Sequence, residues 1–188
     1  MNYEPFPFRH VSDEEIAWAK EQRREHDRKY GKGSPKFPEM SRDRWAGYLY
    51  QLHFKKWGGE FIEDRTGEHL LSYDFGLFGF RIDVKGTIPH DYPPRHDFGV
   101  NVAEAHMAEG RKADTFVFGY FDSATQISYL LGWIDKDSVM QTGVFLNKGE
   151  PFPECPKWEV KVSCWHLKVF DLYPVDAEMV ASSDPIQR

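Results

Sequence analysis

The residues best suited to chemistry lie in one short stretch, SYDFGLFGFRIDVKGT, residues 72–87. Successive side chains of a strand point to opposite faces, so the strand FRIDVK (80–85) sets Asp83 and Lys85 apart from its apolar residues. Asp74 precedes this strand by a hairpin-length gap, and we expect it to approach the same face. Two carboxylates beside a lysine suit Mg²⁺, which prefers one or two carboxylates completed by water and a phosphate oxygen. Such an ion activates water and offsets the charge that develops at phosphorus.

Two helices are expected upstream of this stretch. Ser12 and Glu15 form a capping-box pattern that predicts a helix over 13–30, with a mostly charged and solvated surface. A second helix is predicted from Ser41 to Gly58. Its spacing at i, i+4, i+7 and i+11 predicts one buried face, formed by Trp45, Leu49, Leu52 and Lys56.

Strand signals dominate after the second helix, and the fold class follows from this order. The predicted strands are 60–64, 69–75, 80–86, 114–121 and 127–134, with a short helix after the last of them. The segments 69–75 and 80–86 are expected to form a hairpin, and 166–175 is either a last strand or a docking element. Helices followed by strands predict an α/β (α+β) fold with a central mixed β-sheet flanked by helices.

The arrangement of Asp74, then Asp83-Val84-Lys85, resembles the active-site pattern of the PD-(D/E)XK nuclease superfamily, of phage or prokaryotic type. The resemblance covers about residues 41–135 and implies a restriction-endonuclease-like core with a helix–strand–strand–strand–helix–strand order. It implies that Asp74, Asp83 and the Val84 carbonyl hold Mg²⁺, for which Mn²⁺ substitutes. It assigns Lys85 to positioning the attacking water and steadying the transition-state charge. With this resemblance, the chain divides into an N-terminal helical extension (1–40), a nuclease-like core (41–180) and a flexible tail (181–188).

The sequence departs from that family pattern at two positions. Tyr73 stands before Asp74 where many members have Pro, and Gln51 stands on the second helix where members often carry Glu. Gln51 is able to hold a metal-bound water through its amide oxygen, but it contributes no charge. Three acids are candidates to replace the missing carboxylate: Glu60, Glu63 and Glu68.

The function expected from these residues is metal-dependent hydrolysis of DNA phosphodiester bonds. The alternative is a catalytically weak or inactive nuclease fold that binds nucleic acid or protein, and a hydrolase of small phosphoesters is a third hypothesis. RNA stays open as a substrate, and a homodimer would suit double-strand cleavage. Five basic residues are candidates for contacts with DNA phosphates: Arg44, Lys55, Arg81, Arg95 and Lys112.

Composition limits the remaining classes. Hydrophobic residues make up 40% of the 188 residues, enough for a core, and no apolar run reaches the ~18 residues of a membrane helix. With no leader-like N-terminus, we expect a cytoplasmic protein without membrane contact. The net charge of −6 is uneven, because residues 1–65 hold 13 basic and 12 acidic side chains whereas 114–188 hold 6 and 11. We therefore expect the acids of 114–188 to lie away from the Asp83–Lys85 face.

Two further sets of residues have weaker signals for chemistry. Cys155, Cys164 and His166 form a loose set whose spacing fits a structural zinc site poorly. His90, His96 and His106 follow the central motif, and we expect exposed loop histidines there, with phosphate contact or proton transfer as the alternative.

Overall fold

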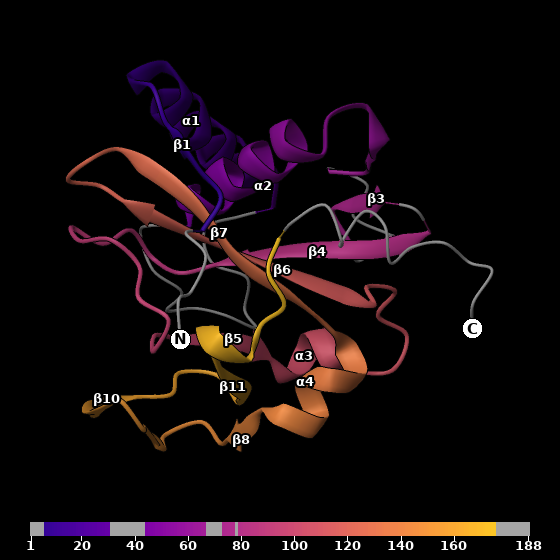
Figure 1. Ribbon diagram of the computed structural model, residues 1–188, viewed down its shortest axis with the longest axis vertical. Coiled ribbons are helices and arrows are strands. Elements are labelled where there is room, and N and C mark those ends of the chain that lie inside the picture. Colours follow the sequence, from indigo (N-terminus) through magenta and orange to yellow (C-terminus); the bar gives the residue numbers. More distant parts are fainter. Residues whose placement is uncertain (1–5, 31–43, 67–72, 78, 176–188) are drawn as a thin grey trace.

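A curled, six-stranded mixed sheet forms the centre of the molecule (Figure 1). The structure, a computed structural model, describes residues 6–30, 44–66, 73–77 and 79–175. The strand order is β1-β7-β6-β4-β3-β2, in which β4 and β6 pair in parallel and the other neighbours are antiparallel. The strands are β1 (Phe8–His10), β2 (Ile62–Asp64), β3 (Phe75–Leu77), β4 (Phe80–Gly86), β6 (Thr115–Asp122) and β7 (Ile127–Asp135). The expected mixed α+β class and central mixed sheet are therefore confirmed.

The helices α1 (Asp13–Tyr30) and α2 (Trp45–Gly58) cover one face of this sheet (Figure 1). The capping box at the start of α1 is confirmed, because Ser12 Oγ accepts from the Glu15 N–H (3.2 Å) and Glu15 Oε2 accepts from the Ser12 N–H (3.1 Å). Ser41, the expected cap of the second helix, lies outside the described residues. The segment 1–40 supplies not only α1 but also β1, which pairs with β7 at the edge of the sheet.

The buried face of α2 differs from the predicted one. Leu52 is half-buried and Lys56 is exposed, whereas the residues in the core are Ala46, Leu49, Tyr50, His53 and Phe54. The buried face of the helix differs because His53 has a hydrogen-bond partner in the core: His53 Nδ1 lies 3.0 Å from Ser128 Oγ of β7. A histidine with a buried partner can therefore face the sheet where the hydrophobic spacing alone favoured Leu52.

Tyr50 fixes α2 to the parallel pair of strands. Gly86 of β4 and Gly119 of β6 are register partners, and a Cβ atom would lie 1.9 Å from Tyr50 Cε2 at Gly86 and 2.3 Å from Tyr50 Cγ at Gly119. The ring thus occupies space that only two glycines leave open, and its hydroxyl donates to the Thr87 carbonyl at 2.9 Å. This contact sets the position of the next helix residue, Gln51.

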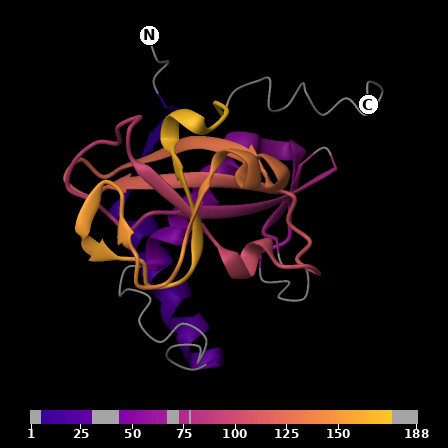
Figure 2. The same ribbon diagram turned by 90° about the horizontal axis from the view of Figure 1, so that it is seen from below.

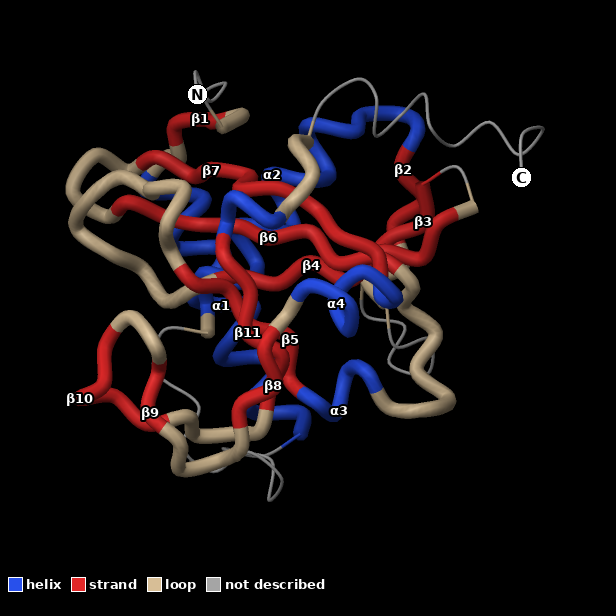
Figure 3. The backbone as a smooth tube through the Cα atoms, turned by 60° about the horizontal axis from the view of Figure 1, so that its bottom comes forward, coloured by secondary structure: helices blue, strands red, loops and turns tan. Residues whose placement is uncertain are grey.

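A second layer packs on the opposite face of the sheet (Figures 2 and 3). Three antiparallel strands, in the order β5-β11-β8, form a small sheet there. The elements of this layer are β5 (Gly99–Ala103), α3 (Glu104–Met107), α4 (Lys136–Thr142), β8 (Val144–Leu146), β9 (Pro151–Phe152), β10 (Cys155–Glu159) and β11 (Cys164–Lys168). Short 3-10 helices cover Gly59–Phe61 and Val169–Asp171.

The two faces of the sheet have separate cores. α2 packs on Ile82 and Val84 in one, and the small sheet and α4 pack on Phe116 and Phe118 in the other. All eight residues of β6 are buried, as expected for a strand covered on both faces. No helix in the described part of the chain combines the length and apolar character needed to cross a membrane.

Candidate active site

Strand β4 carries the centre of the site, and its alternation is as predicted. Ile82 and Val84 are buried in the core beneath α2. Asp83 and Lys85 turn away from these apolar side chains, and their side chains are 10% and 20% exposed. The parallel pairing with β6, which places Lys85 opposite Phe118, holds this strand in the middle of the sheet. The two polar side chains therefore lie on a rigid element rather than on a loop.

Asp83 is paired with two nitrogen-bearing side chains. Its Oδ2 lies 2.5 Å from Lys85 Nζ and 3.3 Å from His106 Nδ1. His106 Nδ1 and Lys85 Nζ lie 3.2 Å apart, so the three groups form one cluster. Burial favours the neutral acid, but the charge of Lys85 and the contact with His106 outweigh it and lower the pKa of Asp83. Asp83 is therefore an anion at neutral pH.

Asp74 approaches the same strand from the residue before β3. Its Oδ2 accepts the Val84 N–H at 2.9 Å, and its own N–H donates to the Ile82 carbonyl at 2.8 Å. Gln51 of α2 also hydrogen-bonds to the Asp74 carboxylate. The β3–β4 hairpin thus meets α2 at Gln51; the first strand of this hairpin, predicted at 69–75, is Phe75–Leu77 among the described residues.

The electrostatics of the two aspartates are opposed. Burial and the negative charge of Asp83 raise the pKa of Asp74 to about 7, although Lys85 and two hydrogen bonds act in the other direction. Near neutral pH, in the absence of a cation, one carboxylate is therefore ionised and the other is poised to hold a proton. A divalent cation would remove this conflict, because it would attract both carboxylates.

The donor set fits a small oxygen-preferring cation. The carboxylates of Asp74 and Asp83 belong to one strand pair, and the amide oxygen of Gln51 is the atom left for a metal or its water once the amide N–H donates to Asp74. Mg²⁺ is held in many sites by one or two carboxylates with several waters. Within the described ranges, no group of three or more His, Cys, Asp or Glu side chains is arranged to hold a metal ion. A cation at this site would therefore depend on two carboxylates with neutral oxygens and water.

His106 belongs to the cluster around Asp83, although its position in the sequence did not indicate this. It was expected to be an exposed loop histidine, but it lies in α3, 32% exposed, against Asp83 and Lys85. His90 and His96 have other surroundings: the His90 ring stacks on Tyr120 at 4.9 Å, and the His96 ring packs on Phe6 at 4.4 Å. His106 lies in α3, which directly follows β5, and the position of β5 depends on its pairing with the distant β11. A short sequence motif therefore could not indicate which histidine reaches the site.

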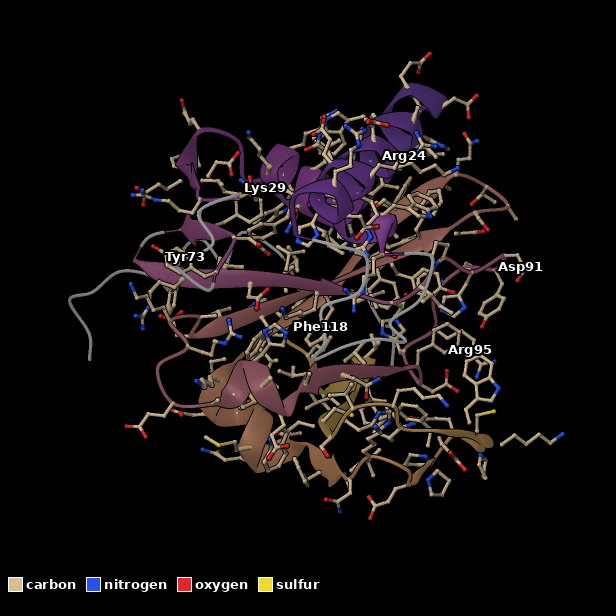
Figure 4. The ribbon with its side chains drawn as sticks, turned by 180° about the vertical axis from the view of Figure 1, so that it is seen from behind. Arg24, Lys29, Tyr73, Asp91, Arg95 and Phe118 are labelled. Atoms are coloured by element: carbon tan, nitrogen blue, oxygen red, sulfur yellow. The ribbon has the colours of Figure 1, made fainter. Side chains whose placement is uncertain are left out.

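The five predicted phosphate contacts are spread over the molecule. Lys55 pairs with Asp64 (2.6 Å), Arg81 with Asp114 (2.9 Å) and Arg95 with Asp97 (2.5 Å). Figure 4 shows Arg95 and Tyr73, the neighbour of Asp74, on opposite sides of the molecule. Lys112 is exposed, and Arg44 is half-buried at the start of α2. Of the five, Arg44 is the residue on the face of α2 that also carries Gln51. Among the described side chains it forms no ion pair.

The acids considered as replacements for the missing helix carboxylate do not join the cluster. Glu60 and Glu63 are exposed, and Glu63 forms an ion pair with Arg65. Glu68 lies outside the described residues.

The cysteines considered for zinc are part of a different, polar arrangement. His166 lies 2.8 Å from Asn101 and 2.6 Å from Glu154, and burial raises the pKa of Cys164 to about 11. Cys164 is therefore a buried thiol in the part of the chain described.

The sequence matches no protein-family model, and no curated protein or solved structure is significantly similar to it. Interpretation of the site therefore depends on its own residues and their geometry.

Proposed function

We propose that this protein is a metal-dependent nuclease that hydrolyses phosphodiester bonds of DNA. The observation that supports this best is the pair of neighbouring carboxylates, half-buried Asp74 and buried Asp83, with the ammonium of Lys85 2.5 Å from Asp83. Ionising both carboxylates in this partly desolvated place costs free energy unless a cation balances their charge. Carboxylates with strongly perturbed pKa values often mark functional sites.

The same proposal includes a restriction-endonuclease-like core for the central part of the fold. The chain order α2, β2, β3, β4, β5, α3, β6 supports this assignment, because only β5, which belongs to the small sheet, is added to the helix–strand–strand–strand–helix–strand order of the restriction-endonuclease-like core. The parallel β4–β6 pair is joined through the segment that contains β5 and α3. The short α3, of four residues, stands where a longer helix is typical of that core.

Each residue has a defined part in the proposed reaction. Asp74, Asp83 and the Val84 carbonyl would hold the metal, and Gln51 keeps the Asp74 carboxylate in place by its hydrogen bond. A bound Mg²⁺ supplies activation of water and stabilisation of the charge at phosphorus. Lys85 holds Asp83 as an anion and offers an ammonium group to a non-bridging phosphate oxygen. Water is kept from the apolar side of β4 by the core under α2.

The test is cleavage of supercoiled plasmid, single-stranded DNA and RNA in Mg²⁺, in Mn²⁺ and in EDTA. We expect cleavage of DNA that requires the metal, and its loss in Asp83→Asn and Asp74→Asn. Asp97→Asn is the matched control, because Asp97 is an exposed carboxylate paired with Arg95. Circular dichroism of each variant establishes that the fold is kept. Metal-dependent cleavage retained by Asp83→Asn would refute the assignment.

A second function, binding of nucleic acid or protein without catalysis, is favoured by Gln51, which leaves the site with two acids. Calorimetric titration with Mg²⁺ separates the two proposals. If neither metal binding nor nicking is observed, the binding function is supported instead.

A further inference from the structure

Two arginines, Arg23 of α1 and Arg44 at the start of α2, lie near each other. Arg44 is half-buried, and its Nη2 is buried without a hydrogen-bond partner among the residues that the structure describes. A buried guanidinium nitrogen without an acceptor is unfavourable, and a ligand oxygen would satisfy it.

Among the residues that the structure describes, one arginine and one carboxylate act on the charge of Arg44. The guanidinium of Arg23 acts on Arg44, since burial first and then the charge of Arg23 lower the pKa of Arg44. Asp27, the carboxylate that opposes this effect, is already paired with Arg23 at 2.8 Å. Arg23 and Arg44 therefore share the carboxylate of Asp27, and both are partly removed from water. An anion bound beside them would balance the second positive charge.

Arg44 is connected with the active site along one face of α2. Arg44, Tyr48 and Gln51 are spaced at i, i+4 and i+7, which places them in line on a helix. Burial raises the pKa of Tyr48, and the charges of Arg23 and Asp74 are among the further influences, so this tyrosine is near both groups. Gln51 hydrogen-bonds to Asp74 itself. The seven steps along the helix from Arg44 to Gln51 span about 10 Å.

This length can be compared with a nucleic acid strand. A strand of duplex DNA advances about 3.4 Å per nucleotide, so about 10 Å along α2 corresponds to two or three nucleotides. An anion bound at Arg44 would then be a neighbouring phosphate of the same strand that enters the Asp74–Asp83 site.

We propose that Arg44, with Arg23 beside it, binds a backbone phosphate two or three nucleotides from the phosphate at the active site. This inference rests on the proposed nuclease function and adds the substrate class: a polynucleotide strand of at least three or four nucleotides, in preference to small phosphoesters. Arg44 acts as a contact to the substrate, and the planar guanidinium suits a phosphate with two parallel hydrogen bonds.

The test measures binding in EDTA, so that it does not depend on cleavage. Fluorescence anisotropy with labelled single-stranded oligonucleotides of two, four, eight and twelve nucleotides gives the affinity of wild type, Arg44→Gln and Arg44→Lys. We expect wild-type affinity to rise between two and four nucleotides. Arg44→Gln should lose about tenfold in affinity for the longer strands and reduce the salt slope by about one. Arg44→Lys, which keeps the charge, should keep the salt slope.

Arg24→Gln is the control for loss of a positive charge, because Arg24 is 68% exposed on the same helix as Arg23 and pairs with Glu21. Its affinity should stay within about twofold of wild type. Calorimetry with inorganic phosphate alone forms the second arm. An Arg44-dependent heat with inorganic phosphate, without any length dependence for oligonucleotides, would show a small-anion site and overturn the proposal.

Equal affinity of Arg44→Gln and wild type at every length would also overturn it. Circular dichroism and thermal melting of Arg44→Gln guard against a folding defect, and Arg44→Lys gives a second, independent variant. Failure of the nuclease proposal has a different signature, namely no metal-dependent cleavage by wild type, whatever the binding data show.

Discussion

The buried histidine of α2 gives a quantitative prediction about acid stability. His53 is 4% exposed and lies 3.0 Å from Ser128 Oγ, so it joins the helix that carries Gln51 to strand β7. Burial, and then the charge of Arg9, lower the pKa of His53 from 6.5 to about 4, against the smaller opposing effect of Glu15. The folded protein therefore keeps this imidazole neutral at a pH at which the unfolded chain has protonated it.

The sign and size of the effect follow from proton linkage. Above about pH 6.5 neither state holds the proton, and stability is unaffected. As the pH falls from about 6.5 to about 4, the unfolded state binds a proton that the folded state refuses, so the free energy of unfolding decreases. The difference between the two pKa values corresponds to about 3 kcal/mol lost over this range.

Urea unfolding at intervals from pH 7.5 to 4.5 measures this loss in wild type and in His53→Asn. Asparagine places an amide near the position of Nδ1, so the contact with Ser128 has a substitute. Its smaller volume lowers stability at neutral pH, but the decline between pH 6.5 and 4.5 should be reduced by about 2 kcal/mol. His10→Asn, at an exposed histidine, is the control and should follow the wild-type curve. Parallel curves for wild type and His53→Asn would refute the reasoning.

The remaining predictions concern the site, the close contact below α2 and the first helix. In EDTA, Asp74→Asn should be more stable than wild type above pH 7 and equal to it near pH 4, because the stability linked to the raised pKa of Asp74 is lost as the pH rises from about 4 to about 7. Urea unfolding at both pH values checks this, and a less stable variant at pH 8 would contradict it. Gly119→Ala should cost about 2 kcal/mol or more in thermal unfolding, since its Cβ would lie 2.3 Å from Tyr50 Cγ; an unchanged melting temperature would show that the ring can move. Ser12→Ala should cost about 1 kcal/mol through loss of the α1 cap, with Ser12→Asp as the variant that restores it.

The parts of the site that lie on one element or one hairpin could be predicted from the sequence. Alternation along β4 separated Asp83 and Lys85 from Ile82 and Val84, and the register of Phe75 with Ile82 brings Asp74 to the same strand. These relations depend on the period of two and on a tight connection, both of which are local properties of the chain.

The parts that depend on distant pairing could not be predicted. His106 reaches Asp83 because β5 pairs with β11, more than sixty positions along the chain. The edge strand β1 has only three residues and forms its register with β7, so its own sequence carries almost no periodic signal. The buried face of α2 was shifted because His53 has a partner in Ser128, and a histidine alone gives no indication of whether such a partner exists.

The acids of the C-terminal half illustrate the same limit for charge. Asp122, Asp135 and Asp171 accept hydrogen bonds at a turn, at the start of α4 and at the second 3-10 helix, so many of these charges are engaged locally. Asp114 pairs with Arg81 at the beginning of β4, on the strand face that also carries Asp83. Asp114 therefore does not lie away from the Asp83–Lys85 face as expected, and the placement of the capping acids relative to that face stays a prediction.

The close fit of Tyr50 over Gly86 and Gly119 has a consequence for how this protein can vary. A larger residue at either glycine requires a smaller one at position 50, and a smaller residue at 50 opens a void over the β4–β6 pair. These three positions should therefore change together among related chains, whatever happens to the surface. An aromatic residue directly before Gln51, with glycines at the two register partners, is thus a signature by which distant relatives could be sought and aligned even where the aspartates have been lost.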